Sequence, residues 1–141
     1  MARADFYLID KPRFREQPLL LVCELAKRGY AANLSILVLA RDTAQAEAID
    51  DLMWSFDPDE YLPHQIAGMD EGDDDTPILI ATPDMDIPAR PMLLNLRDAA
   101  PTGSFERVLE VVPADPSARG PLRERWKHYQ ALGFEVNKHD M

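Results

Sequence analysis

Cysteine and long apolar runs are both scarce in this sequence. The chain has one cysteine, Cys23, so no disulfide can form within it. Cys23 lies in the apolar run LLLVCELA, which favours a buried structural thiol over a catalytic one. No apolar run approaches the roughly 20 residues that a membrane-spanning helix needs, and the opening MARADFYLID lacks the apolar core of a signal peptide. We therefore expect a cytoplasmic protein that does not enter a membrane.

Positive charge is also scarce. The sequence has 15 Lys and Arg residues against 25 Asp and Glu residues, which gives a formal net charge of -10. Nucleic-acid phosphates attract proteins through their summed positive charge, so this balance argues against broad, nonspecific adhesion to DNA or RNA. We expect any connection with DNA to be indirect, through a protein partner.

Glycine is missing where a nucleotide-binding α/β protein would need it. The segment after the first strand-like run reads DKPRFREQP. A phosphate cradle needs glycines at this point so that backbone amides can approach the anion. Asp10 could act as a receiver-type phosphoacceptor, but the runs LVLA, LIAT and LLNLR end without the aspartate and lysine that complete such a site. The sequence therefore predicts neither a nucleotide site nor a phosphoacceptor.

The side chains that could form other catalytic sites are scattered. No serine lies between glycines in a nucleophile elbow, and His64, His128 and His139 lie in separate segments without metal-ligand spacing. A site built from Asp10, Cys23 and His64 is conceivable, but nothing in the sequence brings the three together. We predict no catalytic centre, cofactor or metal ion. The alternative hypothesis is an α/β enzyme that binds a nucleotide or another small molecule.

Strand-like and helix-like segments alternate along the chain. Branched and aromatic residues typical of strands fill the runs at 5–10, 33–40, 77–82, 91–97, 105–113 and 134–138. Apolar residues recur at helical spacing in 18–29, 41–56 and 121–132. Asp42 or Thr43 can cap the second helix, and we expect Gly29 and Gly133 to end the first and third. Since right-handed crossovers place helices on both faces of a parallel sheet, we predict one three-layer α/β domain over residues 1–141, with a mostly parallel sheet.

An acidic run, MDEGDDDTP, occupies residues 69–77. Its consecutive aspartates lack the alternating ligand spacing and the closing glutamate of a calcium loop, so metal binding is the weaker interpretation. We expect a solvated loop that contributes charge to the molecule.

Large apolar side chains gather in the segment LMWSFDPDEYLPHQIAG, residues 52–68. Aromatic residues are readily buried, and Phe56 fits the core. A stretch this rich in proline and aspartate is nevertheless typical of the surface, where tryptophan and tyrosine often anchor contacts between proteins. We predict that Trp54 and Tyr61 belong to a protein-binding surface.

The segment RERWKHYQALGFEV, residues 123–136, concentrates positive charge in an acidic protein. Arg123, Arg125 and Lys127 surround Trp126 in the sequence. On a helical wheel Trp126 lies at the boundary between an apolar stripe and a basic one. The apolar stripe is Leu122, Trp126 and Tyr129, and the basic stripe is Arg123, Lys127 and Gln130. The pattern alone favours a solvated basic face, and the functional alternative is a pocket for an acidic peptide with an apolar end.

In this order and spacing, the segments resemble the chi subunit family of bacterial DNA polymerase III. The resemblance rests on FYLID, VCELA, IDDLMWSF followed by EYLPHQIAG, PILIA, LLNLR, FERVLEVVP and RERWKHYQALGFEV, and it runs nearly from end to end. It implies a non-catalytic subunit of the clamp-loader assembly that acts in DNA replication. It also implies a nucleotide-binding-like α/β fold that has lost its nucleotide site.

The same resemblance implies two binding surfaces. One binds the acidic C-terminal tail of single-stranded-DNA-binding protein. By position its residues are Arg119, Arg123, Trp126, Lys127 and, as a wall of the pocket, Val112. The other binds the psi subunit of the clamp loader or a helicase related to DNA repair. Its residues are Trp54, Tyr61, Pro63 and His64. Trp126 stands where the family commonly has tyrosine, and Tyr61 replaces a common phenylalanine.

Overall fold

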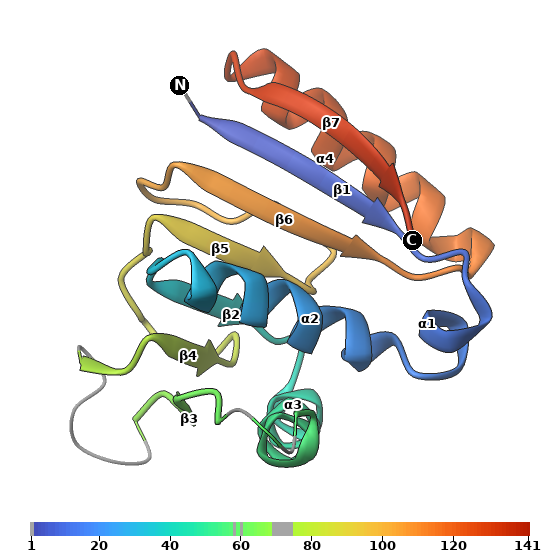
Figure 1. The fold of residues 1–141 in the computed structure, drawn as a ribbon. Helices are drawn as coiled ribbons and strands as arrows, with labels where there is room; N and C mark the ends of the chain where they lie inside the picture. Colours follow the sequence, from blue (N-terminus) through green and yellow to red (C-terminus); the bar gives the residue numbers. More distant parts are fainter. Residues whose placement is uncertain (1, 58, 60, 69–74) are drawn as a thin grey trace.

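The computed structural model describes residues 2–57, 59, 61–68 and 75–141. Within these residues a seven-stranded parallel sheet has the order β3-β4-β2-β5-β6-β1-β7 (Figure 1). The strands are β1 (Arg3–Leu8), β2 (Ile36–Leu39), β3 (His64–Ile66), β4 (Ile78–Ala81), β5 (Met92–Asn95), β6 (Arg107–Val112) and β7 (Glu135–Asp140). The helices are α1 (Pro12–Glu16), α2 (Pro18–Ala31), α3 (Thr43–Ser55) and α4 (Arg119–Ala131). The predicted α/β fold with a mostly parallel sheet is confirmed.

The two faces of the sheet are covered differently. On one face α2 and α3 pack over the strands, in a core cluster that includes Val22, Ile49 and Ile80. On the other face α4 lies behind β1, β6 and β7, and its Tyr129 shares a second cluster with Phe6 (Figure 1). The described segments 82–91 and 96–106, which link β4 to β5 and β5 to β6, contain no helix. On the second face, these two irregular segments therefore cover β2, β4 and β5.

The predicted capping of α3 and the predicted end of α4 are both confirmed. The side chain of Asp42 accepts a hydrogen bond from the backbone N–H of Gln45 at 2.7 Å, which satisfies a free donor of the first helical turn. Gly133 follows α4 with φ of 80°, a left-handed conformation that glycine adopts without steric cost. These two ends follow from local chemistry that is visible in the sequence.

The predicted end of α2 at Gly29 is wrong. The helix continues to Ala31, and the left-handed residue after it is Asn33, with φ of 61°. Gly29 is instead buried against the sheet, where an added Cβ would lie 2.6 Å from Cδ1 of Ile36. This glycine permits a close approach of helix and strand, so α2 needs it for packing.

Two short elements were not expected from the sequence. The helix α1 occupies part of the segment that the sequence suggested was a connection, and β3 lies in the irregular segment after α3. Each has five residues or fewer, too short for a periodic pattern to form. Residues 69–74 of the acidic run lie outside the described residues. No helix in the described ranges is long and apolar enough to cross a membrane.

Candidate functional site

The exposed side of α4 carries the predicted basic residues. Arg119, Arg123 and Lys127 are exposed, and Trp126 is half-buried beside them; these four residues are called the basic surface. The Trp126 ring packs on Phe6 of β1, with 5.0 Å between ring centroids and 41° between the ring planes. Because one side of the indole rests on the core, the ring has a fixed position from which it can meet an apolar group of a partner.

Val112, the predicted wall of the pocket, lies at the end of β6. Its side chain is buried in the core cluster beneath α4, and Leu122 and Trp126 pack against that same cluster. The structure therefore places Val112 on the same face of the sheet as α4. Its side chain supports the floor below the helix and is not itself exposed to solvent.

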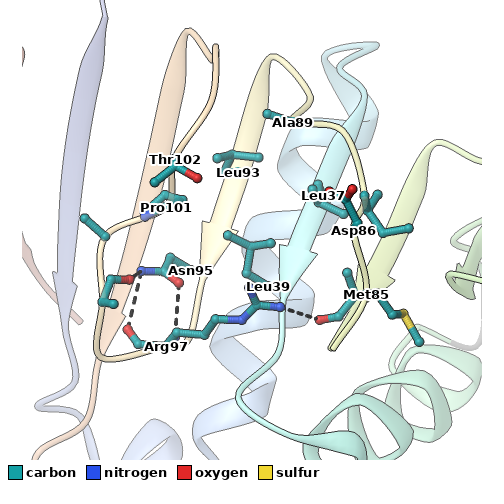
Figure 2. A pocket seen from close by; sticks show the side chains of 14 residues that line it. Leu37, Leu39, Met85, Asp86, Ala89, Leu93, Asn95, Arg97, Pro101 and Thr102 are labelled. Carbon is teal, nitrogen blue, oxygen red and sulfur yellow. Dashed lines mark hydrogen bonds between the residues drawn. The ribbon is translucent and has the colours of Figure 1, made fainter. Parts of the chain in front are cut away.

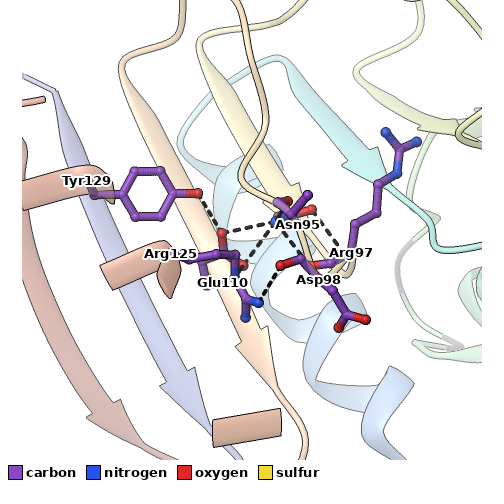
Figure 3. A network of polar contacts seen from close by, with 7 residues as sticks. Asn95, Arg97, Asp98, Glu110, Arg125 and Tyr129 are labelled. Atoms are coloured by element: carbon purple, nitrogen blue, oxygen red, sulfur yellow. Dashed lines mark hydrogen bonds and ion pairs between the residues drawn. The ribbon is translucent and has the colours of Figure 1, made fainter. Parts of the chain in front are cut away.

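Arg125, which neighbours Trp126 in the sequence, does not belong to the basic surface. Its side chain is 6% exposed and turns into the protein, where Nε donates to Glu110 of β6 at 3.0 Å (Figure 3). Nη1 donates to the backbone oxygen of Asp98 at 2.9 Å. The helix thus presents three exposed cations, and its fourth is neutralised inside.

Glu110 is the centre of a buried polar network that sequence reasoning missed. This fully buried carboxylate accepts hydrogen bonds from Asn95 Nδ2 at 3.0 Å, from Arg125 Nε at 3.0 Å and from the Tyr129 hydroxyl at 2.5 Å (Figure 3). Burial raises the pKa of Glu110, and the charge of Arg125 opposes that shift. Burial also raises the pKa of Tyr129, which keeps its hydroxyl a donor. The network fastens α4 to β5 and β6, and so sets which side of the helix faces solvent.

A signal for this network was present in the sequence. Glu110 interrupts the apolar strand run VLEVV, and Asn95 interrupts LLNLR. The two residues pair in register on neighbouring strands. Polar side chains inside otherwise apolar strands need partners when buried, so the interruptions pointed to a buried polar contact.

The second predicted surface lies at the end of α3 and the start of β3. Trp54 is 60% exposed and Tyr61 is 56% exposed, and their rings stack with centroids 5.3 Å apart. His64 packs edge-on against Trp54 at 5.0 Å, and Pro63 beside it is half-buried. These four residues are called the aromatic surface. Such stacked, exposed aromatic rings are typical anchors of protein interfaces.

His64 supports the aromatic surface from below. Its side chain is fully buried, Nδ1 lies 2.5 Å from the backbone oxygen of Leu62, and Nε2 lies 3.2 Å from the carboxylate of Asp50. Oxygen atoms therefore face both ring nitrogens and hold the ring in place. Trp54 and Tyr61 therefore supply the exposed area of this surface, and the buried ring of His64 packs against both of them.

The two surfaces are far apart in the topology. The basic surface lies on α4, over β1, β6 and β7, on one face of the sheet. The aromatic surface adjoins β3, the strand at the opposite edge, and its helix α3 packs on the other face. The two surfaces therefore share no residue and lie on different faces of the sheet.

A cavity of about 860 Å³ lies at the carboxyl ends of the strands, where open α/β sheets bind nucleotides. Its lining includes Pro18 at the start of α2, Asp42 at the start of α3, and Pro113 and Asp115 before α4. No glycine lines it. Prolines lack the N–H that a phosphate cradle uses. Asp42, Asp98 and Asp115 offset the positive charges of Arg41, Arg97 and Arg125 in the same lining, so this lining offers no glycine-rich phosphate cradle.

The conceivable site of Asp10, Cys23 and His64 gains no support from the structure. Cys23 is fully buried, and burial raises its pKa to about 12, so the thiol is protonated. Asp10 is exposed after β1, whereas His64 is buried at β3. In the described part of the chain, no three His, Cys, Asp or Glu side chains gather in a group that could hold a metal ion.

Comparison with solved structures finds the same fold in a different setting. A chain from a Saccharomyces cerevisiae complex of Dbp5 with Nup159, Gle1, IP6 and ADP matches with a TM-score of 0.62 and 16% identity. The match covers 97% of this chain and 41% of the other. At this identity the match shows the α/β fold alone.

Comparison with sequences identifies the family. Residues 1–137 match the family model described as DNA polymerase III chi subunit, HolC. DNA polymerase III subunit chi of Pseudomonas aeruginosa is 29% identical over 143 residues, covering 99% of this chain and 96% of the relative. The Escherichia coli K12 protein of the same name is 31% identical over 147 residues, covering 97% of each. With the predicted resemblance confirmed over nearly its whole length, the chain belongs to the DNA polymerase III chi subunit family.

Proposed function

We propose that this accessory subunit of DNA polymerase III is non-catalytic and joins the clamp-loader complex to single-stranded-DNA-binding protein. In this proposal the basic surface binds the acidic C-terminal tail of that protein during DNA replication. One observation carries the proposal: three exposed cations flank a tryptophan fixed on the core, in a chain whose formal net charge is -10. Such a site attracts an acidic peptide, while the rest of the molecule repels the phosphates of DNA.

In the proposed complex, charged contacts and an apolar contact both contribute to the binding free energy. Arg119 and Arg123 offer guanidinium groups that can hold carboxylates by paired hydrogen bonds, and Lys127 adds a third positive charge. Exposed ion pairs contribute only about 0 to 1 kcal/mol each, so the charges alone give weak binding. The face of Trp126 must therefore supply an apolar contact for the end of the tail. Affinity should be modest and should fall as salt is added.

The aromatic surface is proposed to bind the psi subunit or a repair helicase, and thereby to tether the chain to its assembly. The support for this part is the pair of stacked rings of Trp54 and Tyr61, both more than half exposed. An apolar helix or loop of a partner could bury these rings without displacing a charge. Because the two surfaces lie at opposite ends of the strand order, one subunit can bridge two partners.

Titration calorimetry with a tail peptide tests the first part. Arg123→Ala should weaken peptide binding by up to about fivefold, since an exposed ion pair contributes up to about 1 kcal/mol. Lys127→Glu should weaken it further, because it reverses an exposed charge of the basic surface. Trp54→Ala is the matched control, because it removes an exposed side chain at the other surface. Circular dichroism melts should show all three variants folded.

Unchanged peptide affinity in both α4 variants would remove the basic surface from the proposal. A loss of peptide binding in Trp54→Ala would mean that the two surfaces are wrongly separated. The same variant should weaken association with psi or the helicase in a pull-down with purified partners.

A further inference from the structure

The face of the sheet that α4 leaves uncovered contains a small cavity. Its volume is about 260 Å³, and it lies over β2, β4 and β5 beneath the irregular segments that roof this face (Figure 2). The space corresponds to the liquid volume of about nine water molecules. It is therefore suited to one small molecule, and its volume falls just below the roughly 300 to 1,000 Å³ that is typical of ligand pockets.

The floor and walls of the cavity are apolar. Leu37 and Leu39 of β2, with Leu93 of β5, form the floor (Figure 2). The two irregular segments supply the walls, which include Met85, Ile87, Ala89, Ala100 and Pro101. A ligand here would gain from burying a compact apolar group, and the unbranched side chain of Met85 can adapt to its shape.

The amide of Asn95 lines the cavity but is already occupied. Its Nδ2 donates to the Glu110 carboxylate at 3.0 Å and to the backbone oxygen of Ala99 at 3.0 Å. Its Oδ1 accepts from the backbone N–H of Arg97 at 3.1 Å (Figure 2). Asn95 therefore shapes the end of the cavity and leaves the recognition of a polar ligand group to Arg97.

Arg97 brings a positive charge to the cavity, and it also lines the larger cavity at the carboxyl ends of the strands. Its Nε donates to the backbone oxygen of Ala40 at 2.8 Å, and Nη2 donates to that of Ala81 at 3.2 Å. A guanidinium has five N–H donors, so three have no acceptor among the residues that the structure describes. These three span both terminal nitrogens, which is the arrangement that holds a carboxylate in two parallel hydrogen bonds.

Among the residues that the structure describes, no carboxylate is paired with this guanidinium. Asp98 follows Arg97 in the chain, but the two side chains point apart (Figure 3). Asp86 lines the cavity near Leu37, away from the Arg97 guanidinium, which lies at the ends of β2 and β4 (Figure 2). Burial lowers the pKa of Arg97, as expected for a partly buried cation that lacks an anionic partner.

We infer that this cavity binds a small monocarboxylic acid with a compact apolar body. The carboxylate pairs with the terminal nitrogens of Arg97, and the apolar body lies on Leu39 and Leu93. The site is distinct from the basic surface, because α4 contributes no residue to its lining. It adds a small-molecule site to a protein whose proposed role is to bind other proteins.

The test is an NMR titration of the full chain with 3-phenylpropionate, and with the neutral 3-phenylpropanamide as the matched probe of equal size. The carboxylate should cause saturable shifts at the backbone amides of Leu39, Leu93 and Thr102. The neutral probe should bind about tenfold or more weakly, since it cannot form the charged pair. Equal binding of the two probes, or no saturable shift at these amides, would overturn the inference.

Substitutions at Arg97 and Ala100 test whether the acid binds in this cavity. Arg97→Gln should weaken 3-phenylpropionate binding by about tenfold or more, and Arg97→Lys should retain more of it because the charge is kept. Ala100→Leu keeps Arg97 but fills the cavity from its wall, and should also abolish the shifts. Arg123→Ala should leave them unchanged, which separates this site from the basic surface. Undiminished binding in folded Ala100→Leu protein would show that the acid binds elsewhere.

Discussion

The basic surface and the aromatic surface each expose a tryptophan side chain, but they hold it in different surroundings. Trp126 is half-buried on Phe6, and cations surround it. Trp54 is mostly exposed and rests on Tyr61 and on a buried histidine. The first surface offers charge with a limited apolar area, and the second offers apolar area without exposed cations among its members.

The support beneath each surface differs as well. Under α4 lies a buried ion pair between Arg125 and Glu110, joined by Asn95 and Tyr129. Under the aromatic surface lies one histidine held by backbone and carboxylate oxygens. The basic surface should therefore depend strongly on the interior, whereas the aromatic surface should tolerate changes to its exposed rings.

The largest effect should come from Arg125→Ala. Removing this side chain leaves Glu110 buried without its cation, which costs about 3 to 5 kcal/mol of the free energy of unfolding. Urea denaturation followed by circular dichroism measures the loss. Arg123→Ala, two residues away but exposed, is the matched control and should change stability by less than about 0.5 kcal/mol.

Equal, small losses for the two arginine variants would contradict this distinction. They would mean that Arg125 can turn outward and act with the other cations. The basic surface would then have a fourth cation beside Arg119, Arg123 and Lys127, and the buried network would not position α4.

A smaller effect is expected from Trp54→Ala, and on binding alone. Exposed tryptophans at the centre of interfaces often contribute about 2 kcal/mol or more, so association with psi or the helicase should weaken by about thirtyfold. Stability should change little, because the ring is 60% exposed. Surface plasmon resonance with the purified partner checks the first point and a thermal melt the second. A large drop in melting temperature would show that the ring stabilises the fold.

Added salt should change the binding affinities of the two surfaces differently. Screening of exposed charges grows as the Debye length falls from about 10 Å at 0.1 M to about 3 Å at 1 M. Tail-peptide affinity should fall several-fold over this range, while association through the aromatic surface should hold or strengthen slightly. Calorimetry and plasmon resonance at matched salt concentrations measure both. Parallel losses at the two surfaces would contradict the proposed division between charged and apolar binding.

The smallest expected effect is a change in the pH dependence of stability when Asp5 is replaced. Asp5 lies next to Phe6 on β1. Burial alone raises the pKa of this carboxyl, but hydrogen bonds from His139, Arg107 and Arg3 outweigh burial and lower it overall. A lowered pKa means that Asp5 stabilises the fold above its unfolded value of about 3.9, and that this contribution disappears as pH falls through the folded value.

The difference in unfolding free energy between the natural chain and Asp5→Asn should therefore be full above the unfolded value of about 3.9 and should shrink as pH falls below it toward the lowered folded value. Urea denaturation over this pH range measures it, with tail-peptide binding at pH 7 as a second readout. A stability difference that grows toward low pH would contradict the lowered pKa of Asp5. Lost peptide binding in the folded variant would mean that the polar residues of β1 help to hold Trp126.

The sequence predicted those parts of the fold that depend on local chemistry. Buried parallel strands appear as apolar runs, and the cap at Asp42 follows from its own side chain. The prediction that Gly29 ends α2 is wrong because two roles of a glycine near a helix end have the same sequence pattern. The glycine can end the helix, or it can let the helix pack closely against a strand, as Gly29 does. That distinction depends on Ile36, which only the folded structure brings to Gly29.

The exposed part of the candidate site was also predictable, and its buried part was not. A helical wheel places Arg123 and Lys127 outside and Tyr129 inside, as observed. It cannot show that Arg125 meets Glu110, because that contact joins a helix to a strand 15 residues earlier. Whether the basic surface binds a protein tail stays a prediction.

Calorimetric titration of the natural chain with two versions of the tail peptide tests the central claim most directly. One version ends in a free carboxylate, and the other is identical except for a C-terminal amide. The proposed site predicts saturable binding of the first and binding about tenfold or more weaker for the second, because the terminal charge pairs with the guanidinium groups of α4. Equal affinities for the two peptides, or no binding of either, would contradict it.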